Sequence, residues 1–131
     1  MRVIVGDPKT KTPMMAVLMT NAKANPYWHV PPELAKSLTA QKVKELGATN
    51  YFRDFHYEVM SDWNGNARPL DPASIDWAKV RASKALPTFM VRQKPGPWNS
   101  MGMMKFEMPN DFGIYLHDTP LKEKFAGDRW I

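Results

Sequence analysis

The sequence predicts one mainly β domain of the α+β class, with strands towards both ends of the chain and a helical insert between them. Short runs of β-branched or alternating residues recur near both ends, each closed by Gly, Asn or Pro, and indicate strands joined by turns. Between them, prolines precede apolar residues at helical spacing. With 131 residues, 44% of them hydrophobic, the chain can bury one core of ordinary size.

The first third of the chain is expected to hold a β-hairpin and then a helix. Residues 2–5 are rich in β-branched side chains and the next three, Gly-Asp-Pro, suit a tight turn, so residues 14–20 are the expected partner strand. A helix should begin at Pro32, whose missing N–H is not needed in a first turn. Thr39 is predicted to cap a second helical part that stops at Gly47.

The remaining elements follow from alternation and turn chemistry. Residues 57–61 alternate as a strand does and an Asn-Gly turn follows them, then Asp71 or Ser74 should cap a short helical turn. Residues 88–93 are an expected strand. Residues 101–108 and 114–117 are predicted to pair across a loop rich in Asn, Asp and Gly, and Pro120 should begin a short helix.

Composition narrows the function. There are 18 Lys and Arg against 13 Asp and Glu, a formal net charge of +5, so a polyanionic partner fits the charge. No nucleic-acid motif is present, however, and we expect no nucleic-acid partner. No apolar run reaches the length of a membrane span, and the N-terminus lacks the features of a signal peptide. The 131 residues include no cysteine, which excludes disulfides and thiolate chemistry from these residues themselves.

Two side chains near the C-terminal end are candidates for catalysis. Tyr115 and His117 lie two residues apart on an expected strand, so they share one face. The backbone carbonyl of Asp118 can accept a hydrogen bond from Nδ1–H of His117 and orient the imidazole. The alternative is an edge strand with two amphipathic residues, where Asp118 or Thr119 merely caps the next helix.

Metal and cofactor sites have no support in the sequence. The three histidines, His29, His56 and His117, match no known spacing of metal ligands, and His29 and His56 are flanked by residues that favour packing. Neither GxGxxG nor GxxxxGK[ST] occurs. We therefore expect neither a metal ion nor a cofactor.

The stretch from Pro95 through Asn99, Ser100, Met101 and Gly102, together with Tyr115-Leu116-His117-Asp118-Thr119-Pro120, resembles the active-site half of an L,D-transpeptidase catalytic domain of the YkuD-like family. The segment Asn25-Pro26-Tyr27-Trp28-His29-Val30-Pro31-Pro32 is similar to one in the larger, periplasmic branch of that family, which usually has asparagine where His29 stands. Residues 33–86 match loosely and would correspond to a variable capping insert over the active site.

The resemblance implies cell-wall cross-linking in the periplasm or cell envelope. A cysteine of the family attacks a peptidoglycan stem tetrapeptide before its terminal D-alanine, and an amine acceptor then takes the acyl group. His117, Tyr115 and Asp118 match the catalytic positions, and the expected substrate-binding residues are Trp98, Asn99, Met101 and Gly102. The partners implied are peptidoglycan stem peptides, and no oligomeric state is implied.

The family's Ser-x-Gly-Cys-x-Arg motif is absent, and its cysteine would fall just beyond Ile131. Residues 1–131 are thus expected to be a single partial catalytic domain that ends before its nucleophile, with residues 125–131 as the connecting segment. Such a chain should form no acyl-enzyme. Two other classes stay open: a non-catalytic peptidoglycan-binding module and a basic nucleic-acid binder.

Overall fold

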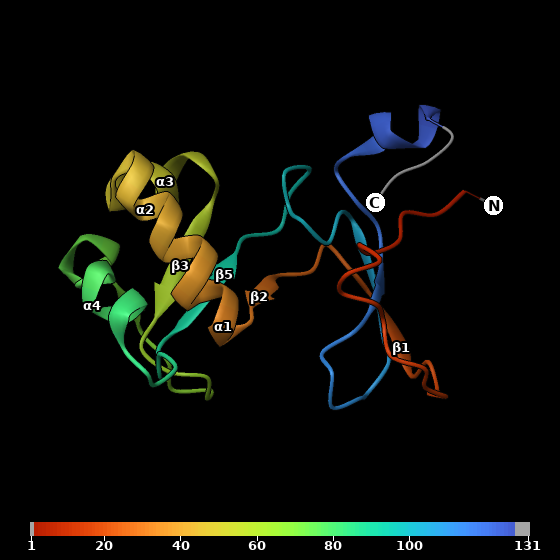
Figure 1. The fold of residues 1–131 in the computed structure, drawn as a ribbon, viewed down its shortest axis with the longest axis horizontal. Helices are drawn as coiled ribbons and strands as arrows, with labels where there is room; N and C mark the ends of the chain where they lie inside the picture. Colours follow the sequence, from red (N-terminus) through yellow and green to blue (C-terminus); the bar gives the residue numbers. More distant parts are fainter. Residues whose placement is uncertain (1, 128–131) are drawn as a thin grey trace.

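The computed structural model describes residues 2–127, and it arranges them as two antiparallel sheets side by side (Figure 1). Helices cover only one of the sheets, and residues 2–20 lie with the other. This confirms the predicted α+β class. The last part of the expected connecting segment, residues 128–131, lies outside the described residues.

The elements follow one another with short connections after residue 20. In chain order they are β1 (Asn21–Ala24), β2 (Trp28–Val30), α1 (Pro32–Leu34), a π-helical segment (Ala35–Thr39), α2 (Ala40–Leu46), α3 (Ala48–Asp54), β3 (Tyr57–Met60), β4 (Pro69–Leu70), a 3₁₀ turn (Pro72–Ser74), α4 (Trp77–Ala82), β5 (Met90–Gln93), β6 (Met104–Glu107), β7 (Leu116–His117) and a 3₁₀ helix (Lys122–Ala126). No helix within residues 2–127 combines the length and apolar character that crossing a membrane requires.

The larger sheet has the order β2-β5-β3-β4 and carries the main core. Its register aligns Val30, Val91 and Val59 in one row on the face that the helices cover. All three are almost fully buried, and Phe52 of α3 and Trp77 of α4 pack in the same cluster. Residues 33–86, which include nearly all of the helical residues that cover this sheet, therefore supply much of the core.

The smaller sheet has the order β1-β6-β7. Lys23 pairs with Lys105, and Lys105 pairs with His117, so these three side chains form a row across one face. The sequence of β1, Asn-Ala-Lys-Ala, has little β propensity of its own. Pairing with β6 imposes the strand, as tertiary context commonly does.

The predicted N-terminal hairpin is wrong. No strand forms within residues 2–20, and the first strand begins only at Asn21, where it pairs with β6. The β-branched segment instead lies against the apolar face of the smaller sheet, where Val3 and Val5 line a cavity together with Phe106 and Leu116. The segment thus contacts the sheet without forming a ladder, and Val3 and Val5 each stay 60% exposed. The predicted turn does occur, because Thr10 N–H donates to the Asp7 carbonyl over 2.9 Å.

The helix does begin at Pro32, but Thr39 does not cap a second one. The residue has helical angles and is 1% exposed, inside a continuous helical run. The π-helical segment widens the turn so that Ala35, Thr39 and Ala40 all face the core. Gly47 ends α2 with φ +83°, as predicted, and α3 begins directly after it.

The other local predictions are confirmed with shifted boundaries. Strands β3, β5, β6 and β7 lie within the predicted ranges, and the Asn64-Gly65 turn joins β3 to β4. Asp71 caps the 3₁₀ turn by accepting from Ala73 N–H. A second carboxylate that the prediction missed, Asp76, caps α4.

Asn99 joins the two sheets. Two segments cross between them, residues 25–27 and 94–103, and Asn99 lies on the second with 0% exposure. Its amide Nδ2 donates to the carbonyls of Pro26, Gln93 and Lys94 at 3.0–3.2 Å, and its Oδ1 accepts from Met101 N–H at 2.7 Å. One buried side chain therefore ties both crossings together.

We predict that Asn99→Ala lowers the free energy of unfolding by about 3 kcal/mol, because it leaves several buried backbone groups unpaired. The matched control is Asn66→Ala, at an exposed position whose side chain makes no hydrogen bond among the described residues. It should change stability by less than about 0.5 kcal/mol. Urea denaturation of both variants measures the difference, and equal stabilities would contradict the assigned role of Asn99.

Candidate functional site

A cleft of about 410 Å³ lies between the two sheets. One wall comes from the β2 side, the other from β7 and the residues just before it. The lining residues are Trp28, His29, Pro31, Trp63, Met101, Gly113, Ile114, Tyr115 and His117. The cleft thus brings together three residues predicted from the sequence, His117, Tyr115 and Met101.

The imidazole of His117 is oriented by the backbone that follows it. Its Nδ1 lies 2.5 Å from the carbonyl oxygen of Asp118. A carbonyl can only accept, so Nδ1 carries the proton and donates, and Nε2 is left as an unprotonated acceptor when the ring is neutral. This is the contact expected from the sequence. The capping alternative is not realised: Leu121 N–H donates to Thr119 Oγ1 over 3.1 Å, but no side chain caps the helix Lys122–Ala126.

The carboxylate of Asp118 holds the backbone that carries this carbonyl. It accepts from Met103 N–H at 3.0 Å and pairs with the ammonium group of Lys122. The hydrogen bond from Lys122, with that from Met103, lowers the pKa of Asp118 to about 2. Asp118 is therefore ionised at neutral pH. Its backbone carbonyl contacts His117, while its carboxylate binds Met103 and Lys122.

Gly102 makes room for that carboxylate. Its φ is +62°, and a Cβ added there would lie 2.5 Å from Oδ2 of Asp118. Gly102 also donates its N–H to the Asn99 carbonyl over 2.8 Å. It does not line the cleft, so its contribution is to let residues 99–103 and Asp118 approach each other.

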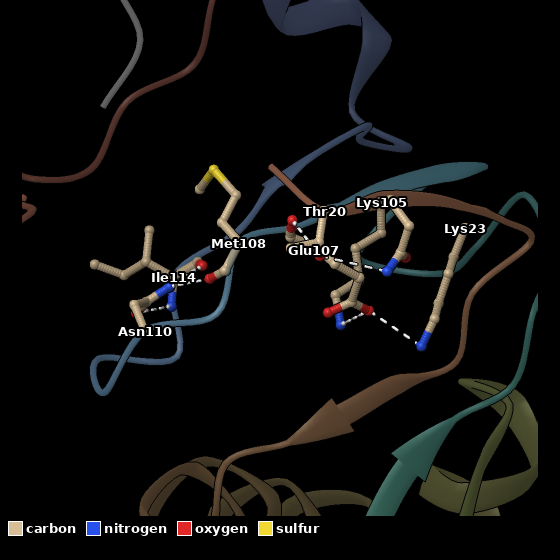
Figure 2. Close-up of polar contacts among 8 residues, drawn as sticks. Thr20, Lys23, Lys105, Glu107, Met108, Asn110 and Ile114 are labelled. Carbon is tan, nitrogen blue, oxygen red and sulfur yellow. Dashed lines mark hydrogen bonds and ion pairs between the residues drawn. The ribbon is translucent and has the colours of Figure 1, made fainter. Parts of the chain in front are cut away.

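Tyr115 is held by a lysine that the sequence analysis missed. The ammonium of Lys105 lies 3.8 Å from the centroid of the Tyr115 ring, within cation–π range. Lys105 is 9% exposed and pairs with Glu107 at 3.2 Å, and Lys23 pairs with the same carboxylate at 3.2 Å (Figure 2). Burial opposes ionisation of Glu107, but hydrogen bonds from both lysines still hold its pKa below the usual value.

Asn110 shapes the loop that leads into Tyr115. Its amide donates to the carbonyls of Met108 and Ile114 at 2.5 and 2.8 Å, while its Oδ1 accepts from Phe112 N–H and Ile114 N–H (Figure 2). One side chain thereby closes the loop between β6 and β7. The closed loop sets the register that places Lys105 opposite His117.

The other predicted substrate-binding residues lie apart from the cleft. Asn99 is buried with both polar side-chain atoms hydrogen-bonded, so it supports the loop. Trp98 is 42% exposed and stacks on His56, with ring centroids 3.8 Å apart. Of this group, only Met101 lines the cleft.

His29 and Trp63 also line the cleft, although sequence reasoning did not select them. Their rings lie 6.3 Å apart. Desolvation by partial burial lowers the pKa of His29, although the residue as a whole is exposed, and the charges of Arg92, Lys105 and Lys23 lower it further. The sequence analysis set His29 aside because its neighbours Trp28 and Val30 favour packing. The pairing of β2 with β5 brings it to this wall. Within residues 2–127, no three His, Cys, Asp or Glu side chains are grouped so that they could hold a metal ion.

The mixed α+β fold with two antiparallel sheets is consistent with the family that the sequence comparisons identify. Residues 1–130 match the family model of the L,D-transpeptidase catalytic domain, YkuD, and the chain belongs to that family. A Haemophilus influenzae protein that is provisionally named an L,D-transpeptidase is 38% identical over 124 residues, which are 95% of this chain and 24% of the relative. The chain thus spans about a quarter of the length of that relative.

We predict that Gly102→Ala destabilises the domain by roughly 2–4 kcal/mol, because the new methyl group must displace the Asp118 carboxylate at a strained φ. Gly113→Ala is the matched comparison, since its φ is +63° and a Cβ there meets nothing within 4 Å. It should cost about 1 kcal/mol, from the backbone alone. Thermal or urea unfolding of both variants gives the comparison, and equal losses would show that the contact with Asp118 does not matter.

Proposed function

We propose that this domain carries the histidine side of an L,D-transpeptidase active site, acting on peptidoglycan stem tetrapeptides in the periplasm or cell envelope. The observation that supports this most is the hydrogen bond from Nδ1 of His117 to the Asp118 carbonyl. It leaves Nε2 as the basic atom, on a ring that lines a cleft together with Tyr115. A general base needs this arrangement of a free acceptor nitrogen and a fixed ring.

In the proposed reaction, Nε2 of His117 takes the proton of a cysteine thiol and the thiolate attacks the carbonyl carbon that precedes the terminal D-alanine. The Tyr115 hydroxyl donates to the oxyanion of the tetrahedral intermediate. The C–N bond breaks, the proton on His117 passes to the departing D-alanine amine, and a thioester remains. An acceptor amine then attacks the thioester, loses its proton to His117 and releases the thiolate.

The thiol in this proposal comes from outside the 131 residues, which contain no cysteine. Met101 would contact substrate along the cleft wall. Trp98, Asn99 and Gly102 would act through the loop that carries Met101. Residues 33–86 would be an insert in a single catalytic domain, and its part that caps the site would be the segment around Trp63, because the helices cover the other face of the larger sheet.

The test is mass spectrometry of the complete gene product after incubation with a stem tetrapeptide. We expect a covalent adduct of the tripeptide acyl group, and His117→Ala should reduce its rate of formation by about 10²-fold or more, since a general base is lost. His56→Ala, at a histidine that contacts Trp98 outside the cleft, is the control and should retain the adduct. The chain of residues 1–131 alone should form none.

An adduct on residues 1–131 alone would contradict the proposed thiol. Saturable binding to peptidoglycan by the complete gene product, with no adduct under any condition, would contradict the catalytic proposal and favour the non-catalytic binding module. An unchanged rate in His117→Ala would exclude His117 as the base.

A further inference from the structure

His29 faces the candidate base from the opposite wall of the cleft. On the larger sheet, β2, β5 and β3 align His29, Arg92 and Glu58 in one row. Because the neighbouring residues Val30, Val91 and Val59 point into the helix-covered core, this row lies on the other face. His29 and His117 line the same cleft, so two imidazoles from two different sheets share it.

Cations outnumber carboxylates on the strands beside the cleft, although the charged side chains named here do not line it. On the smaller sheet, Lys23 and Lys105 share the single carboxylate of Glu107. On the larger sheet, Arg92 and Lys94 share Glu58, with distances of 2.6 and 3.9 Å. Each pair of cations therefore has one counter-charge, and an anion in the cleft would supply the missing one.

Charges of both sheets act on His29. Partial burial is the main cause of its lowered pKa, followed by Arg92 on β5, Lys105 on β6 and Lys23 on β1, while Glu107 works in the opposite direction. His117 of β7 and Tyr115 just before that strand line the same cleft. His29 therefore favours its neutral form at pH 7, because burial first and then the nearby cations disfavour its charged form.

We propose that the His29 side of the cleft binds the terminal carboxylate of the donor peptide, and that His29 takes up a proton when this carboxylate arrives. The inference rests on the proposed function, because it assumes that a stem tetrapeptide occupies the cleft. The carboxylate of the terminal D-alanine is one residue from the scissile bond, so it must lie in the cleft where His117 works. Arg92, Lys105 and Lys23 would attract it.

The proton balance is simple. The free cleft holds neutral His29, and the bound complex holds an imidazolium that donates a charge-assisted hydrogen bond to the carboxylate. The proton comes from the solvent and returns to it when the C-terminal D-alanine leaves. Since binding takes up a proton, affinity must fall as pH rises between the pKa of His29 in the free protein and its higher pKa in the complex, by up to about tenfold per pH unit.

The experiment is isothermal titration calorimetry of the complete gene product with a stem tetrapeptide ending in D-alanine, in buffers of different ionisation enthalpy. The peptide with a free carboxylate should bind with uptake of roughly 0.3–1 proton near pH 6.5, whereas the same peptide with a terminal carboxamide should bind with almost none. His29→Asn should abolish the uptake and weaken binding of the free-carboxylate peptide about tenfold or more at that pH.

His56→Asn is the matched control. It removes an imidazole outside the cleft, at φ +60°, which asparagine tolerates, and should leave the proton uptake unchanged. Equal uptake with the carboxamide peptide, or binding without uptake, would overturn the inference while leaving the proposed function intact. If neither peptide binds, the proposed function itself fails. The two-peptide comparison uses the unaltered protein, so it decides the question even if His29→Asn folds poorly.

Discussion

The geometry of the site depends on one buried amide. The cleft exists only between the two sheets, and the crossings at residues 25–27 and 94–103 connect them (Figure 1). Asn99 hydrogen-bonds to both crossings and to the end of β5, and every polar atom of its side chain is paired. A buried polar network of this kind stabilises a unique arrangement because any displacement would leave a backbone group unpaired. The position of one cleft wall relative to the other thus depends on a residue that does not itself line the cleft.

A series of contacts connects Asn99 to the imidazole of His117. The Asn99 carbonyl accepts from Gly102 N–H, Gly102 leaves space for the Asp118 carboxylate, and the Asp118 carbonyl orients His117. On the other side of His117, Asn110 closes the loop that sets the pairing of β6 with β7. Two asparagines, each saturated with hydrogen bonds, therefore hold a histidine that remains exposed to the cleft. A general base must be held in a fixed orientation while its acceptor nitrogen stays accessible.

Local chemistry in the sequence predicted residues 32–117 better than residues 2–24. Turn and cap preferences depend on few neighbouring residues. They therefore correctly predicted the helix end at Gly47, the Asn64-Gly65 turn and the loop before Ile114. Tyr115 and His117 were found from strand alternation and family likeness. Residues 2–5 have the composition of a strand but no strand to pair with. Strand β1 lacks that composition but pairs with β6, so in both places the available pairing determined whether a strand formed. His29 and Trp63 reach the cleft only through tertiary structure. The position of Lys105 could have been predicted from the sequence, because a hairpin centred on Asp111 pairs Lys105 with His117.

The central claim is that Nδ1 of His117 carries the ring proton and leaves Nε2 as the base. Nitrogen-15 NMR of the imidazole, at a pH where the ring is neutral, tests it directly, because protonated and unprotonated ring nitrogens differ widely in chemical shift. The account predicts a protonated-type shift for Nδ1 and an unprotonated-type shift for Nε2. The reverse pattern, with the proton on Nε2, would contradict it, because Nδ1 would then have no proton to donate to the Asp118 carbonyl.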